Sequence, residues 1–278
     1  MSLLVTEWSK AQPGARVAGL ATADVQSVSG VKDLVAAVLE HGLVVLPSQP
    51  LAIMQVLAET VGTAEVVLPV EHRYPGSESL RLQSNVPGVG VNGGGHYWHA
   101  DGSWLPRSMD LTLLACIEAP SEGGTTSFVD AAAVYDDFDD EFREFVNGLT
   151  GSFPNREVLR ADLQAMGLNS QEMLDRTVDV THPAVRVHPY TGRRALIVNE
   201  VWMRGIVGMS DDAADPVLSD LARRVERSSF RYVHRWTAGD LLIWDNHRVL
   251  HKAAPPPAGT VKTTVRARVP QLADRWLP

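Results

Sequence analysis

The sequence has 278 residues and only one cysteine, Cys116, so no disulfide bond can form within the chain. Cys116 lies in the apolar run 111–117, where a buried structural thiol is expected rather than a reactive nucleophile. A chain without disulfides suits a reducing compartment, and we therefore expect a cytoplasmic protein.

The chain also lacks an excess of basic residues and any long apolar run. Its 25 Lys and Arg are outnumbered by 33 Asp and Glu, and the formal net charge of −8 argues against non-specific nucleic-acid binding. No apolar stretch reaches the roughly 18 residues of a membrane span, and the N-terminus lacks the pattern of a secretory signal. We expect a small-molecule substrate as partner, with no nucleic acid and no membrane, and the sequence leaves homo-oligomerisation open.

Hydrophobic periodicity predicts short strands with a few helices around them. Helical spacing covers 31–40, 51–61, 131–147 and 215–226, and strands are predicted at 43–47, 111–118, 125–129, 194–199, 240–244 and 263–269. The segment from Phe153 to Arg176 is polar and irregular, and we interpret 150–180 as an insertion in a single domain over 1–278. The pattern predicts a mainly β fold with peripheral helices (α+β), built as a jelly roll or barrel.

The sequence His99-Ala100-Asp101 carries the strongest chemical signal. Residues i and i+2 of a strand point to the same face, so His99 and Asp101 can reach one metal ion. Far along the chain, His247 and His251 follow an apolar strand that ends in a polar turn, where a histidine emerges at the mouth of a barrel. Two imidazoles and one carboxylate form the facial triad of non-haem Fe(II) sites, although an H-x-D pair alone also arises by chance among nine histidines.

Three motifs together resemble the TauD/TfdA family of Fe(II)- and 2-oxoglutarate-dependent dioxygenases. They are Trp98-His99-Ala100-Asp101-Gly102-Ser103, Pro120-Ser121-Glu122-Gly123-Gly124-Thr125-Thr126 and the segment from Gly239-Asp240 to His251. The resemblance implies a double-stranded β-helix, a cupin-like jelly roll, with Fe(II) as cofactor and 2-oxoglutarate and O2 as co-substrates. It also implies His99, Asp101 and His251 as metal ligands, because the family's W-D-N-x-x-x-x-H spacing selects His251, and a structural or pocket-rim role for His247.

The resemblance also points to residues that would hold 2-oxoglutarate. Thr126 stands where the family presents a hydroxyl to a carboxylate of this co-substrate. The family binds the far carboxylate through an arginine after the distal histidine, since a guanidinium makes two charge-assisted hydrogen bonds to a carboxylate. Two spacings occur: one falls on Lys262, which departs from the arginine pattern, and the longer one falls on Arg266, our first candidate, with Arg268 next.

Family substrates often carry acidic groups held by polar residues near the H-x-D motif, and the candidates in this chain are His72, Tyr74, Trp104 and Arg204. The resemblance predicts hydroxylation of a C–H bond of a small organic acid or amino-acid-like substrate, with release of succinate and CO2. Asp101 disfavours halogenation, in which a chloride replaces the carboxylate. Alternatives are desaturation or another oxidative rearrangement with the same cofactors, a zinc-dependent cupin-type hydrolase, and a non-catalytic binding barrel.

Overall fold

The structure is a computed structural model that describes residues 4–7, 12–18, 20–68, 70–92, 94–165 and 171–277. Its helices are α1 (Thr22–Gln26), α2 (Val28–His41), α3 (Leu51–Val61), η1 (Val70–His72), α4 (Ala131–Asp136), α5 (Asp140–Asn147), α6 (Asn155–Ala165), α7 (Gln171–Arg176), α8 (Asp211–Glu226) and η2 (Asp274–Trp276). Its strands are β1 (Leu4–Glu7), β2 (Ala15–Ala18), β3 (Leu43–Leu46), β4 (Arg81–Ser84), β5 (Leu111–Glu118), β6 (Thr126–Asp130), β7 (Thr150–Phe153), β8 (Val180–Pro183), β9 (Val185–Val187), β10 (Arg194–Leu196), β11 (Gly205–Ile206), β12 (Arg231–His234), β13 (Leu241–Asp245), β14 (Val249–Ala253) and β15 (Thr263–Val269).

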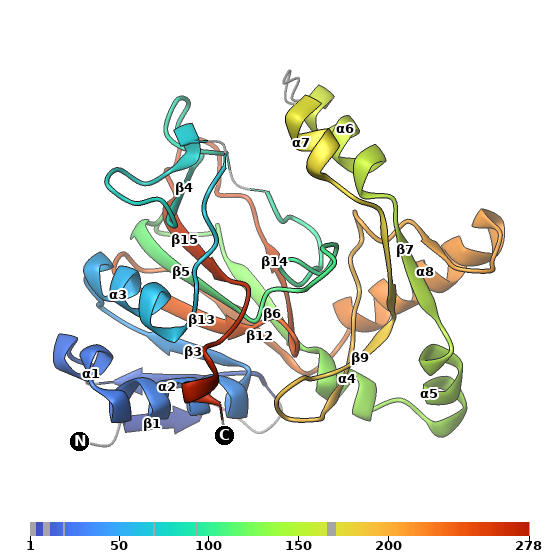
Figure 1. Ribbon diagram of the computed structural model, residues 1–278, viewed down its shortest axis with the longest axis horizontal. Coiled ribbons are helices and arrows are strands. Elements are labelled where there is room, and N and C mark those ends of the chain that lie inside the picture. Colours follow the sequence, from blue (N-terminus) through green and yellow to red (C-terminus); the bar gives the residue numbers. More distant parts are fainter. Residues whose placement is uncertain are drawn as a thin grey trace.

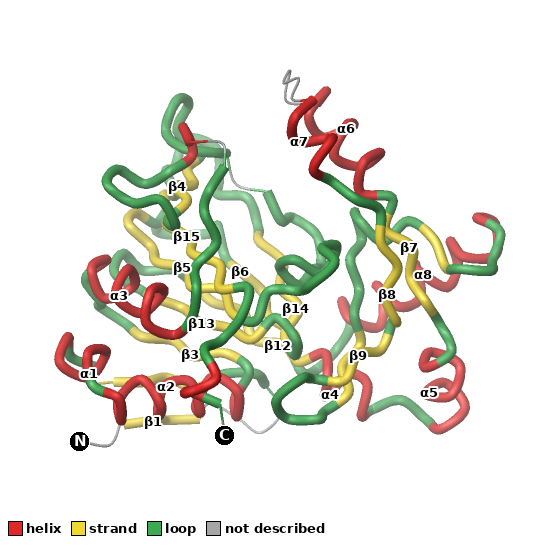
Figure 2. The backbone as a smooth tube through the Cα atoms, in the orientation of Figure 1, coloured by secondary structure: helices red, strands yellow, loops and turns green. Residues whose placement is uncertain are grey.

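The main sheet has seven strands in the order β1-β2-β3-β13-β5-β15-β4, so the late strands β13 and β15 each lie between two earlier strands. Each central strand has a period of two, which divides its side chains between two cores. In β13, Leu241 and Ile243 belong to the core under helices α1 to α3, whereas Leu242 and Trp244 belong to a core on the opposite face. Figures 1 and 2 show helices α1 to α3 outside this sheet.

A second sheet, β12-β6-β14, covers the other face of the main sheet. Phe128 of β6 and Val249 of β14 share one buried core with Trp244 of β13. The molecule is therefore sheet-rich with peripheral helices and has two packed sheets, consistent with a jelly-roll core. None of the helices within the described residues has the length and apolarity needed to cross a bilayer.

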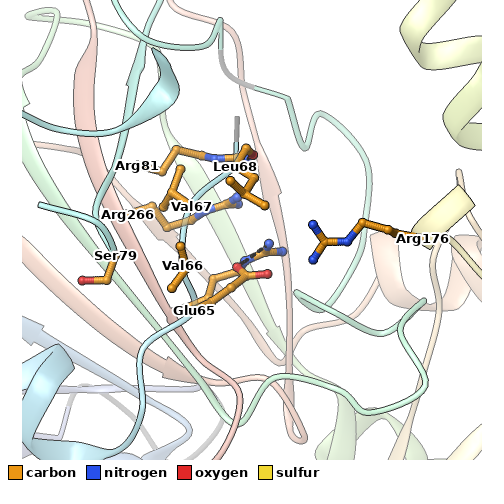
Figure 3. A pocket seen from close by; sticks show the side chains of 9 residues that line it. Glu65, Val66, Val67, Leu68, Ser79, Arg81, Arg176 and Arg266 are labelled. Carbon is orange, nitrogen blue, oxygen red and sulfur yellow. Dashed lines mark hydrogen bonds and ion pairs between the residues drawn. The ribbon is translucent and has the colours of Figure 1, made fainter. Parts of the chain in front are cut away.

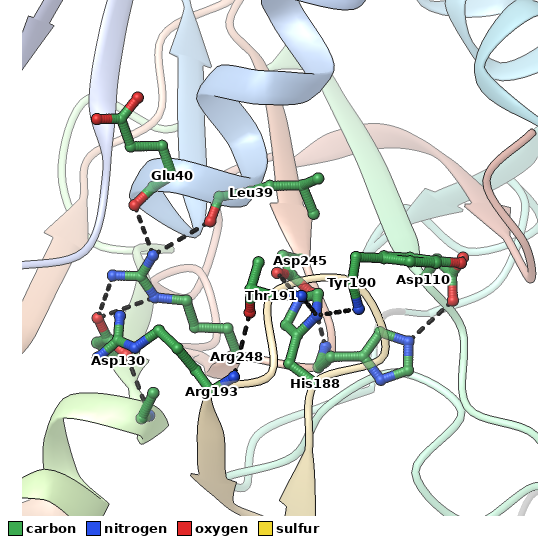
Figure 4. Close-up of polar contacts among 12 residues, drawn as sticks. Leu39, Glu40, Asp110, Asp130, His188, Tyr190, Thr191, Arg193, Asp245 and Arg248 are labelled. Carbon is green, nitrogen blue, oxygen red and sulfur yellow. Dashed lines mark hydrogen bonds and ion pairs between the residues drawn. The ribbon is translucent and has the colours of Figure 1, made fainter. Parts of the chain in front are cut away.

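The remaining elements, from β7 to β11 with helices α4 to α8, form a second lobe with its own apolar core. Figure 1 shows this lobe beside the two sheets. The connection between β9 and β10 joins it to the sheets, because the ring of His188 bonds to the buried carboxylate of Asp245 at 2.7 Å. Tyr190 and His247 both bond to Asp110 in the same network, shown in part in Figure 4.

The structure corrects two of the sequence-based boundaries. The helix predicted over 131–147 is two helices, because Asp139 caps a new one by accepting a hydrogen bond from the backbone N–H of Phe142 at 2.8 Å. The sequence analysis assigned no helix between Phe153 and Arg176, where the structure has α6 and α7. α6 is predominantly polar, with Val158 and Leu163 as its buried apolar residues, and residues 166–170 lie outside the described part.

The contact between the lobes gives a prediction about stability. Replacing His188 by Phe leaves the buried Asp245 without its partner, and we expect a loss of about 3–5 kcal/mol in the free energy of unfolding. The control is Arg193→Gln, in the same β9–β10 connection as His188. It removes an exposed ion pair between Arg193 and Asp136, and it should lower the free energy of unfolding by less than about 1 kcal/mol. Urea unfolding of both variants makes the comparison, and equal losses would contradict this account.

Candidate metal centre

His99, Asp101 and His251 lie together at the end of the two-sheet core. One ligand atom from each falls within 4.8 Å of the others, and the three side chains are buried. His251 comes from β14, and reciprocal backbone hydrogen bonds join it to His99, at 3.1 Å from His99 N–H and 2.8 Å from His251 N–H. This bridge brings two residues from distant parts of the sequence into register, and the H-x-D spacing adds Asp101.

The imidazole nitrogens are oriented towards the carboxylate. Nδ1 of His99 bonds to the carbonyl oxygen of Tyr97 at 2.9 Å, so this nitrogen carries the proton and Nε2 keeps its lone pair. The Nε2 atoms of His99 and His251 lie 4.0 Å from Oδ1 and Oδ2 of Asp101, respectively. Nδ1 of His251 is buried without a hydrogen-bond partner among the described residues.

The electrostatics of the cluster match the protonation states that a divalent metal requires. Burial lowers the pKa of both His99 and His251, so both rings are neutral at pH 7. Burial alone would raise the pKa of Asp101, but the guanidinium of Arg266 beside it holds this pKa well below its ordinary value. Two neutral imidazoles beside an ionised carboxylate, all three buried, fit a divalent cation.

A hydrogen-bond network fixes the Asp101 carboxylate, and sequence reasoning missed it. The hydroxyl of Thr112 on β5 donates to Oδ2 of Asp101 at 2.8 Å. The side-chain amide of Asn246 donates to Thr112 at 3.0 Å and accepts from the Asp101 backbone N–H at 3.1 Å. A hydroxyl within the apolar run 111–117 and the Asn of the W-D-N motif were the available signals.

His247, the competing histidine of the distal motif, lies outside this cluster. Its Nε2 bonds to Oδ1 of Asp110 at 2.8 Å, and its backbone N–H bonds to Asp245. Asp110 also accepts from the backbone N–H of Leu272. His247 therefore helps to fasten the turn after β13.

The three basic candidates for 2-oxoglutarate binding have different partners. Nη1 of Arg266 contacts Oδ1 of Asp101 at 3.3 Å, and Arg268 forms an ion pair with Glu65 at 2.5 Å. Both point to the metal side of β15, because the alternate residues Val265, Ala267 and Val269 fill the helix-covered core. Nζ of Lys262 donates to the carbonyl oxygen of Gly124 at 2.6 Å, close to Thr126 in sequence.

Thr126 and Lys262 meet at Trp236, deeper in the two-sheet core. The indole N–H of Trp236 donates to the Thr126 hydroxyl at 2.9 Å, and the Lys262 ammonium lies 5.1 Å from the Trp236 ring centre. Burial lowers the pKa of Lys262 to about 8. A hydroxyl and an ammonium therefore lie at one place on the metal side of the sheets.

The four substrate candidates from the sequence are not brought together. Trp104 stacks on Trp202 at 5.0 Å, and Trp202 donates to the hydroxyl of Tyr97, whose ring lies 4.8 Å from that of His99. His72 ends η1, with its Nδ1 buried and unpartnered among the described residues. Tyr74 packs on the helix-covered core, and Arg204 lines a separate cavity beside α8. Trp104 alone of the four joins the aromatic group that continues to His99.

Comparison with known proteins gives three consistent findings. The family described as "Taurine catabolism dioxygenase TauD, TfdA family" matches residues 7–267. An (S)-phenoxypropionate/alpha-ketoglutarate-dioxygenase of Sphingobium herbicidovorans is 30% identical over 253 residues, covering 87% of this chain and 86% of the relative. An alpha-ketoglutarate-dependent sulfonate dioxygenase of Saccharomyces cerevisiae is 31% identical over 159 residues, 56% of this chain and 37% of the relative. The crystal structure of a taurine dioxygenase from Burkholderia xenovorans superposes with a TM-score of 0.79 at 23% identity, covering 97% of this chain and 89% of the other, which supports the fold.

The network around Asp101 predicts a change in metal affinity. Thr112→Val removes the hydroxyl that orients the carboxylate, and we expect metal affinity to fall about 10- to 100-fold. Thr112→Ser keeps the hydroxyl and serves as the matched control. Titration of the metal-free protein with Mn(II), followed by calorimetry, measures both, and unchanged affinity in Thr112→Val would contradict the assigned role.

Proposed function

The chain belongs to the taurine catabolism dioxygenase TauD, TfdA family, and on this premise we propose that it oxidises, by hydroxylation, a C–H bond of a small organic acid. It is an oxidoreductase, an alpha-ketoglutarate-dependent dioxygenase that uses Fe(II), 2-oxoglutarate and O2. Membership decides against the zinc-dependent hydrolase and the non-catalytic barrel considered from the sequence. The observation that carries the proposal is the buried cluster of His99, Asp101 and His251.

These three residues would hold the iron, since their neutral imidazoles and ionised carboxylate supply a compact set of donors. When bound, Fe(II) with 2-oxoglutarate and O2 supplies the oxidising power, and 2-oxoglutarate leaves as succinate and CO2. Thr112 and Asn246 hold the carboxylate in one orientation. The stacked Trp104 and Trp202 form an aromatic wall together with Tyr97, whose ring lies beside that of His99.

We assign the core to a double-stranded β-helix of the cupin-like jelly-roll type, within one catalytic domain over 1–278 that carries an insertion around 150–180. The two sheets that share the core of Phe128 and Trp244 support this assignment. The second lobe adds the wall formed by Trp202.

The distal carboxylate of 2-oxoglutarate fits best at Thr126 and Lys262. His251 lies opposite Phe128 in the β14–β6 ladder, and Thr126 is two residues further along β6, on the same face. Two residues of a strand span about 7 Å, which suits a five-carbon dicarboxylate with its other end at the metal. The Lys262 ammonium and the Thr126 hydroxyl both contact Trp236 at this distance from the metal site, and both can donate hydrogen bonds to the distal carboxylate.

Arg266 and Arg268, the candidates favoured by the sequence, already have carboxylate partners. Arg266 contacts Asp101, and Arg268 is paired with Glu65. We therefore propose Lys262 as the distal anchor and place Arg266 beside the metal, at the end of the site where the substrate approaches. The relatives named for phenoxypropionate and sulfonate both act on acids, which supports an acidic substrate for this chain.

Anaerobic titration with Fe(II) and 2-oxoglutarate tests the proposed function directly. We expect the weak visible charge-transfer band of the chelated co-substrate in the wild type. His251→Ala should abolish this band because a metal ligand is lost, whereas His247→Ala should retain it because His247 lies outside the cluster. Absence of the band from folded wild-type protein would contradict the proposed dioxygenase function.

The lysine anchor predicts a pH dependence. The Lys262 ammonium must be protonated to bind a carboxylate, and its pKa is about 8, so affinity for 2-oxoglutarate should fall as the pH rises above 8. Lys262→Arg should remove this fall because a guanidinium stays charged, and Lys262→Gln should weaken binding about ten-fold or more at pH 7.

Calorimetry with the Mn(II)-loaded protein, under anaerobic conditions, measures these affinities. Arg266→Gln is the competing variant, because it removes the arginine favoured by the sequence. If Arg266→Gln weakened 2-oxoglutarate binding while Lys262→Gln left it unchanged, the distal carboxylate would belong to Arg266.

A further inference from the structure

A cavity of about 470 Å³ opens next to the metal centre, within the size range of sites that bind small organic ligands. Arg266, which contacts Asp101, forms part of its wall, so the cavity adjoins the metal cluster. One side is apolar and is made by Val66, Val67 and Leu68. Four arginines also line it: Arg81, Arg266 and Arg268 from β4 and β15, and Arg176 from α7; Figure 3 labels Arg81, Arg176 and Arg266.

The arrangement of three of these arginines is costly for a folded protein. Arg81 of β4 lies directly opposite Arg266 of β15, and Arg268 is two residues along on the same face. Like charges that face each other across a strand pair are destabilising. Arg266 and Arg268 have Asp101 and Glu65 as counter-ions.

Arg81 has no such counter-ion. It makes no ion pair among the described residues, and its Nη2 donates to the carbonyl oxygen of Leu68 at 2.9 Å. Burial and the neighbouring Arg266 and Arg268 lower the pKa of Arg81 to about 10, which still leaves it charged at pH 7. A half-buried guanidinium without a counter-ion, directed into a cavity, is suited to binding an anion.

A fourth guanidinium reaches the cavity from the second lobe. Arg176 ends α7, and in Figure 3 its guanidinium is directed towards those of Arg81 and Arg266 across the opening. Its contact with Glu172 is 3.7 Å long between side chains that are 66% and 82% exposed. Such an exposed pair is weak, so Arg176 can bind an anion at little cost.

We propose that Arg81 and Arg176 bind the acidic group of the primary substrate, while its apolar body packs on Val66 and Leu68. This inference rests on the proposed function, which already gives an acidic substrate, and it adds the residues that recognise the acidic group and the apolar body of that substrate. Val66 and Leu68 are 54% and 43% exposed in the wall of the cavity, so their apolar surface is available for contact with a ligand. The acidic group then neutralises Arg81, the one arginine of the strand pair without a counter-ion.

The test compares carboxylic acids with their uncharged primary amides. The probes are phenylacetate, 3-phenylpropionate and hexanoate, each with its amide, and the protein is loaded with Mn(II) and N-oxalylglycine, so that no turnover occurs. Calorimetry gives the ratio of acid to amide affinity. For wild-type protein we expect at least one acid to bind about ten-fold or more tightly than its amide.

Arg81→Gln and Arg176→Gln should each reduce this ratio towards one and leave the affinity for N-oxalylglycine unchanged. The matched control is Arg160→Gln, an exposed arginine of the neighbouring helix α6 that does not line the cavity, and it should keep the wild-type ratio. Thermal unfolding without ligand separates binding from structure: Arg81→Gln relieves like-charge repulsion and should not lower Tm. If Arg81→Gln failed to fold, the ratio of acid to amide affinity measured for Arg176→Gln, on the exposed helix α7, would still test the proposal.

Three results would overturn the inference. The first is wild-type protein that binds every amide as well as its acid. The second is an Arg81→Gln variant that loses N-oxalylglycine instead of the acid, which would place Arg81 in the co-substrate site. The third is a wild-type ratio retained in Arg176→Gln and in any folded Arg81→Gln. Failure of the wild type to bind N-oxalylglycine with Mn(II) would instead contradict the proposed function.

Discussion

The buried carboxylate of Asp101 is the charge on which the rest of the site depends. Burying an ionised carboxylate costs several kcal/mol unless hydrogen bonds and cations compensate, and this chain brings four different segments to it. Thr112 of β5 and Arg266 of β15 contact its two oxygens, and Asn246 after β13 bonds to its backbone. His251 of β14 completes the set. The packing order of the sheets is therefore also the order that assembles the metal ligands.

Much of this centre could be predicted from the sequence because its geometry is local. The H-x-D spacing identified two ligands that lie close together, although His99 lies in an isolated β-bridge and Asp101 in the turn that follows rather than on one strand face. The distal motif supplied both the histidine and, in Asn246, a member of the supporting network. Thr112 was not recognised, because a single hydroxyl in an apolar run carries no local sign of its partner. The partners of Arg266 and Lys262 were equally hidden, since they depend on how β15 lies against β5 and on the turn at Gly124.

The fold was predictable where apolar residues are concentrated in the sequence and less so where they are sparse. The central strands β3, β5 and β13 are buried on both faces, so they stand out in the sequence as short apolar runs. In the second lobe, α6 is predominantly polar and α7 has only 6 residues, so neither stands out in the sequence by its apolar content. The break between α4 and α5 depends on one capping aspartate, Asp139, within an acidic run that also suits a continuous helix.

The interleaving of the main sheet has a consequence for how the chain acquires its structure. β13 inserts between β3 and β5, and β15 between β5 and β4, so early strands lack their sheet neighbours until late residues are available. Such long-range pairing slows folding, because loop closure must precede the contacts that reward it. The His99–His251 bridge likewise joins an early segment of the chain to a late one. Binding of the metal by all three ligands is therefore a late event in folding, because the ligands come together only after both sheets have formed.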